Sequence, residues 1–175
     1  MAQINIDGGP HGSLTLLAGT AGEKRFWPYP TTGRSLNLLR RAVSIIDNNI
    51  FKKNVACNNY FKRLSTSPAS RSFDDVWSDA GIWISYDART GLTWDGVTNT
   101  VFGKEIAIGE DAFKTGNVWY VTAVIVHELA HTNGAGGPPS IAASSALKFC
   151  GLTGLYDGAV GAKDNVGPGP ENRTV

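Results

Sequence analysis

The spacing of apolar and polar residues divides the chain into a helix-rich first half, a few strands, and two later helices. Apolar side chains recur every three or four positions from Ser35 to Asn48, which predicts an amphipathic helix. Weaker patterns of the same kind predict a helix at 54–64 and a short one that opens at 72–75. Strand-like alternation occupies three other stretches: 3–18, 82–86 and 104–109. We therefore expect an α+β fold, rich in helix, with a small mixed sheet.

A helix of a different kind is predicted after Asn117, a good N-cap residue. The run 118–126 is apolar almost throughout, so this helix should be buried on most of its surface. It continues into His127-Glu128-Leu129-Ala130-His131, and the Asn133-Gly134 pair then suits a left-handed C-cap that ends it. A further helix is expected at 140–151, opened by proline and serine and closed by glycine.

The five residues at 127–131 carry the clearest chemical signal in the chain. Histidines four positions apart project from the same face of a helix, so His127 and His131 can bind one zinc ion together. Glu128 lies off that axis and is well placed to take a proton from a metal-bound water. Because buried polar side chains must find partners inside the protein, the pattern predicts a metal-dependent hydrolase rather than a chance pair of histidines.

On this motif the chain resembles the zincin metallopeptidases, and the resemblance extends loosely to the preceding segment. It implies a zincin-like fold, Zn²⁺ as cofactor, a peptide or protein substrate, and endopeptidase rather than exopeptidase activity, with Glu128 as general base. In zincins a strand ending near the active helix forms the edge of the substrate cleft. We expect Lys104 to Gly109 to be that strand, where an extended peptide can pair; an ordinary internal strand is the alternative.

The third zinc ligand departs from the familiar branches of that family. Gly137 stands where one branch has a histidine, no glutamate follows Glu128 until Glu171, and the stretch 132–156 contains no aspartate. A ligand of the usual kind at the usual spacing is therefore missing.

Asp157 is our first choice for the third ligand, because the predicted helix at 140–151 would be followed by a return toward the metal. Its neighbour Tyr156 would supply a phenol, which some zincins use to stabilise the oxyanion. The alternative is that Asp157 simply belongs to a turn. Asp164 is the second choice. His11 could reach the site from a glycine-rich loop, but we expect it to be a loop histidine without a role in the site.

Composition narrows the remaining possibilities. Sixteen basic and fifteen acidic residues among 175 leave the chain near neutrality, so nucleic acid is not expected as a partner. The longest apolar run is too short for a membrane span. We expect the protein to be a monomer. No secretory signal is visible, which leaves a cytoplasmic location or export by a signal-independent route. We expect one catalytic domain at 1–160 and a Gly/Pro-rich tail at 161–175.

Cys57 and Cys150 are too few for a disulfide scaffold and too far apart for a zinc knuckle. They can pair with each other or remain reduced and buried, and we expect buried thiols.

Two other classes of function stay open. A degenerate zincin domain could bind a metal or a partner without cutting, since the standard third ligand is missing. Alternatively, the chain could be a toxin or effector domain of a larger polypeptide, which its small size and Gly/Pro-rich ends suggest.

Overall fold

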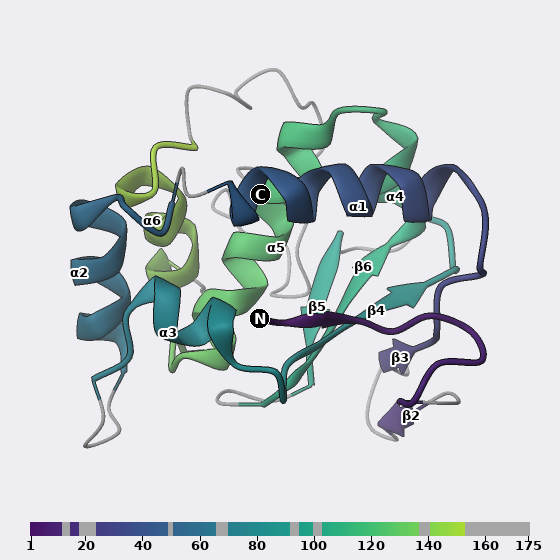
Figure 1. Ribbon diagram of the computed structural model, residues 1–175, viewed down its shortest axis with the longest axis horizontal. Helices are drawn as coiled ribbons and strands as arrows, with labels where there is room; N and C mark the ends of the chain where they lie inside the picture. The colour runs from purple at the N-terminus through teal and green to yellow at the C-terminus, as the bar shows by residue number, and fades with distance from the viewer. Residues whose placement is uncertain are drawn as a thin grey trace.

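The computed structural model describes residues 1–11, 15–17, 24–48, 51–65, 70–91, 95–99, 103–136 and 141–152. Within them, six helices accompany a four-stranded mixed sheet and a separate two-stranded hairpin (Figure 1). The prediction of a helix-rich α+β fold with a small mixed sheet is confirmed. No helix in this part of the chain has the length and apolar character needed to cross a bilayer.

The main sheet has the strand order β1-β4-β6-β5. Its first three strands run parallel to one another, and β5 pairs with β6 in the antiparallel sense. The bounds are Gln3–Ile4 for β1, Trp83–Asp87 for β4, Gly96–Thr98 for β5 and Glu105–Gly109 for β6. The strand predicted at 104–109 is therefore an internal strand, and our assignment of it as the edge of a cleft was wrong. In the described part of the sheet, β5 takes that place beside the motif helix.

The helices follow the sequence pattern closely. Those predicted at 35–48, 54–64, 118–132 and 140–151 are present with bounds shifted by a residue or two, and the short one after Ser72 is confirmed. The observed bounds are Arg34–Asp47 for α1, Val55–Leu64 for α2, Phe73–Ser78 for α3, Glu110–Lys114 for α4, Val118–Thr132 for α5 and Ile141–Phe149 for α6.

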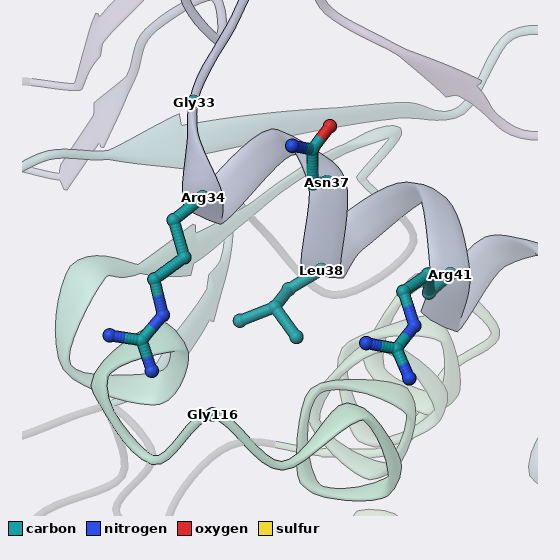
Figure 2. Close-up of a pocket in the computed structure, with 6 residues that line it drawn as sticks. All are labelled: Gly33, Arg34, Asn37, Leu38, Arg41 and Gly116. Atoms are coloured by element: carbon teal, nitrogen blue, oxygen red, sulfur yellow. The ribbon is translucent and has the colours of Figure 1, made fainter.

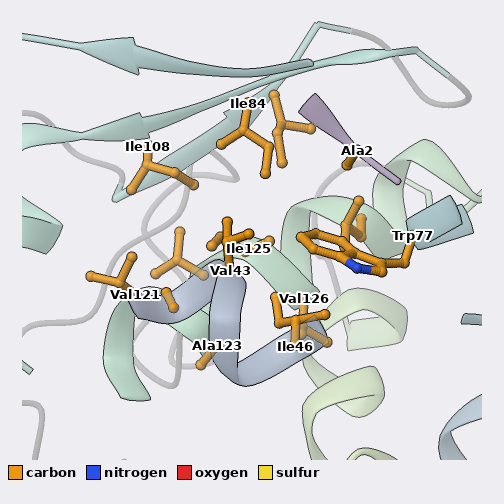
Figure 3. Packing of buried hydrophobic residues seen from close by; sticks show 14 of the residues in the cluster. Ala2, Val43, Ile46, Trp77, Ile84, Ile108, Val121, Ala123, Ile125 and Val126 are labelled. Carbon is orange, nitrogen blue, oxygen red and sulfur yellow. The ribbon is translucent and has the colours of Figure 1, made fainter. Parts of the chain in front are cut away.

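Helix α5 lies in the main core. It packs between α1 on one side and the sheet on the other, where isoleucines of β4 and β6 meet its apolar residues (Figure 3). Thirteen of its fifteen residues are buried. At its start, Asn117 Oδ1 accepts from the backbone N–H of Trp119 at 2.9 Å, as expected of an N-cap residue. The opposite face of the sheet carries the hairpin of β2 (Thr15–Leu17) and β3 (Lys24–Phe26), where Phe26 packs on Val97 and Ala107.

Cys57 and Cys150 form a disulfide, so the expectation of separate buried thiols was wrong. Their Cα atoms lie 4.4 Å apart although 93 positions separate them in the chain. The bond joins α2 to the end of α6, and both cysteines are buried. Because α6 in turn packs on α5, the disulfide braces the layer of helices that supports the motif.

Candidate metal centre

The two histidines of the motif face each other at the C-terminal end of α5. Their Nε2 atoms are 3.3 Å apart, and the side chains are withdrawn from solvent, with His127 fully buried and His131 5% exposed. The i, i+4 spacing predicts this arrangement, since it places the two residues one helical turn apart on one face.

The hydrogen bond at Nδ1 of His131 determines which of the two ring nitrogens carries the proton and which carries the lone pair. Nδ1 of His131 lies 3.0 Å from the carbonyl oxygen of Ala135. A carbonyl oxygen only accepts hydrogen bonds, so Nδ1 carries the proton and Nε2 presents its lone pair toward His127. The turn at Gly134, with φ 109°, brings Ala135 back under the end of the helix. Histidine ligands of metals are oriented by hydrogen bonds of this kind.

The separation of the two Nε2 atoms fits a shared zinc ion. Nitrogens bound at about 2.0–2.1 Å to one tetrahedral zinc lie about 3.3–3.4 Å apart. The observed 3.3 Å falls in this range without any movement of the helix. His127 and His131 could therefore hold one zinc ion as they stand.

The structure describes no third ligand beside the two histidines. Among the described residues, no group of three His, Cys, Asp or Glu side chains is placed to bind a metal. Tyr156, Asp157 and Asp164, the residues predicted for this part of the site, all belong to the stretch beyond residue 152 and outside the described residues.

His11 contacts residues of the sheet in place of the two motif histidines. Its ring stacks on Trp83 at 4.2 Å between ring centroids, and its Nε2 contacts Glu105 Oε1 at 2.5 Å. Trp83 and Glu105 are paired neighbours on the sheet, and they alternate with Ile84 and Ile106, which face the core around α5. His11 therefore lies on the opposite face of the sheet. Burial raises the pKa of the Glu105 carboxyl, and the nearby imidazole opposes that shift.

Glu128 contacts strand β5. Its carboxylate is fully buried, and Oε2 accepts a hydrogen bond from Thr98 Oγ1 at 2.5 Å. The same hydroxyl lies 3.2 Å from the backbone carbonyl of Glu128. A short bond from a hydroxyl to a buried carboxylate is of the charge-assisted kind, and it holds the carboxylate in one position.

Gly96 makes room for that carboxylate. A Cβ atom at position 96 would lie 2.7 Å from Glu128 Oε1 and 2.7 Å from Val124 Cγ1, closer than real Cβ atoms approach other atoms. In the register of the sheet, Gly96 pairs with Ile108 and Thr98 with Ile106. Both isoleucines belong to the core, so Gly96 and Thr98 share the face that meets α5.

Strand β5 is held along α5 at two points. Near its start, Tyr120 donates from its hydroxyl to Asp95 Oδ2 at 2.5 Å, and at its end Thr98 bonds to Glu128. The sequence pattern missed Gly96 and Thr98, because they lie in a stretch that reads as a linker rich in turn-forming residues. Their only sequence signal is a three-residue Gly-Val-Thr segment, which is too short to stand out by periodicity.

Comparison of the chain with protein-family models, with curated proteins and with solved structures finds no match in any of the three.

Proposed function

We propose that the chain is a zinc-dependent metallopeptidase in which His127 and His131 bind the metal and Glu128 acts as general base. The observation that carries the proposal is the pair of buried Nε2 atoms 3.3 Å apart, the separation that one tetrahedral zinc ion requires. Two buried histidines beside a buried glutamate make a costly arrangement in an apolar helix, and a bound metal would give the three side chains a common role.

Bound zinc would supply the Lewis acidity that activates a water molecule and polarises the scissile carbonyl. The protein's own part begins with Glu128, which accepts the proton of the attacking water at Oε1, the oxygen that Thr98 does not bond. It then passes this proton to the leaving nitrogen. Thr98 keeps the carboxylate oriented during both transfers, and Gly96 leaves the space that the carboxylate occupies.

The substrate proposed here is an extended peptide that pairs with β5. In an antiparallel pair, alternate residues direct their backbone groups to the partner strand. Gly109 N–H donates to Asp95 O and Asn99 N–H donates to Glu105 O, so the backbone groups of Gly96 point away from β6. A peptide strand added along this edge would pass close to Glu128. Pairing of this kind uses the interior of a chain and requires no terminus, so we expect an endopeptidase.

The test is the variant Glu128→Gln, which keeps the size of the side chain and removes its basicity. We expect it to retain one zinc per chain by elemental analysis and to lose at least about 100-fold in hydrolysis of unfolded casein. The matched control, His127→Ala, should lose both zinc and activity. Full activity of Glu128→Gln with zinc still bound would show that another group is the base. Stoichiometric zinc in the wild-type chain without any turnover would instead favour a binding domain that does not cut.

A further inference from the structure

A groove between α1 and the turn that joins α4 to α5 is lined in part by polar and basic side chains. It has a volume of about 590 Å³, within the range of ligand sites, and we call it the α1 groove (Figure 2). One wall is formed by Arg34, Asn37, Leu38 and Arg41 of α1. Residues with this spacing lie on one face of a helix. The other wall is the turn between α4 and α5. The lining residues are Gly33, Arg34, Asn37, Leu38, Arg41 and Gly116.

The groove is positively charged. Arg34 and Arg41 both extend from α1 toward the same wall, with Leu38 between them (Figure 2). Among the described residues, neither guanidinium forms an ion pair with a carboxylate. The first turn of α1 contains no acidic residue, and its N-cap, Gly33, provides no side-chain cap. The uncompensated end of the helix therefore adds to the positive potential.

In the described part of the chain, a carboxylate that contacts the start of α1 is already engaged. Glu110 Oε2 accepts from Ser35 Oγ at 2.9 Å and from Tyr86 Oη at 2.5 Å. Across the turn, Lys114 is bonded to Asp111. Among the described residues, the two arginines of the groove are thus cations without a carboxylate partner.

We propose that the α1 groove binds an acidic peptide segment with two carboxylate side chains three positions apart. Arg34 and Arg41 are seven residues apart, which separates them by about 10 Å along the helix axis. Side chains three positions apart in a peptide with the polyproline II conformation lie on the same face and are separated by a similar length, about 9 Å. Leu38 gives the middle of the peptide an apolar contact, and the Asn37 amide can bond to its backbone.

Binding can be measured with two fluorescent octapeptides that differ only at two positions. The first contains Glu-Leu-Ala-Glu at its centre and the second has glutamine in place of each glutamate. With the full chain at low ionic strength, we expect anisotropy to show binding of the first peptide only, weakened by added salt. Arg34→Gln and Arg41→Gln should each weaken it about three- to fivefold, as is typical of exposed ion pairs. Arg40→Gln is the matched control, since Arg40 belongs to the same helix but does not line the groove, and it should leave the affinity unchanged.

Four results would overturn the proposal. The glutamine peptide could bind as well as the glutamate peptide, or neither could bind. Arg40→Gln could weaken binding as much as Arg34→Gln, which would indicate non-specific attraction. Inorganic pyrophosphate could compete at concentrations similar to the peptide, which would identify a small-anion site. None of these measurements depends on zinc or on hydrolysis, so their outcome is separate from that of the proposed peptidase function.

Discussion

Replacing Thr98 by valine removes one hydroxyl from the candidate site and keeps the shape of the side chain. In the native protein that hydroxyl donates to Glu128 Oε2 at 2.5 Å, and the carboxylate is fully buried. Valine has the same branching at Cβ, so strand β5 retains its packing against α5. The carboxylate loses a donor without a cavity being created.

The expected size of the effect follows from the burial of the carboxylate. A hydrogen bond to a charged group contributes about 1.5–3 kcal/mol, and water cannot replace the lost donor easily at a buried position. If the hydrogen bond orients Glu128 for proton transfer, its loss raises the activation free energy of hydrolysis by the same amount. We therefore expect kcat/KM to fall about 10- to 150-fold, since about 1.4 kcal/mol corresponds to a factor of ten.

The assay compares zinc-loaded wild type, Thr98→Val and Thr98→Ser on one peptide bond identified by mass spectrometry of digested casein. Serine keeps the Oγ donor, so Thr98→Ser should recover most of the activity. Zinc content should be equal in all three proteins, because Thr98 bonds to Glu128 rather than to either histidine. Wild-type kcat/KM in Thr98→Val, or an equal loss in Thr98→Ser, would refute the positioning role of the hydroxyl.

Two further variants test the structure around the site. Replacing both Cys57 and Cys150 by serine should lower the free energy of unfolding in urea by about 2–5 kcal/mol, because a bond between residues 93 positions apart restricts the unfolded chain strongly. An unchanged urea midpoint would contradict the disulfide. Gly96→Ala should destabilise by about 1–3 kcal/mol and reduce hydrolysis, since the new methyl group meets the Glu128 carboxylate. Gly136→Ala is its control, as nothing lies within 4 Å of the added Cβ, and equal effects of the two would argue against that clash.

The helices were predictable because each has a long repeating signal. In α1, leucines, valine and isoleucine occupy one face over fourteen residues, and the observed helix differs from the predicted 35–48 by one residue at each end. The apolar run of α5, its Asn117 cap and its Asn133-Gly134 end were all readable in the same way. The separation of the two histidine Nε2 atoms follows from this helix and needs little else from the fold.

Strand β5 could not be predicted, because three residues give too short a pattern to recognise. Its position depends on pairing with β6 and on bonds to α5, which are contacts between distant parts of the chain. The same limit applies to β6, whose apolar pattern suits an edge or an internal strand equally. The pairing of the cysteines likewise depends on how α6 returns to α2, which no local pattern reports. The interactions that position Glu128 are long-range contacts of this type.

The disulfide determines how a cut in the backbone of this chain would be detected. The bond joins positions 57 and 150, so β4, β5, β6 and all of α5 lie within the loop that it closes. A single backbone cut inside that loop produces two polypeptides that remain joined through sulfur. Such a nicked molecule would migrate as one species without reductant and as two with it, and its mass would exceed that of the intact chain by one water. Partial self-digestion would therefore pass unnoticed in electrophoresis under non-reducing conditions, whereas an intact-mass measurement would reveal it.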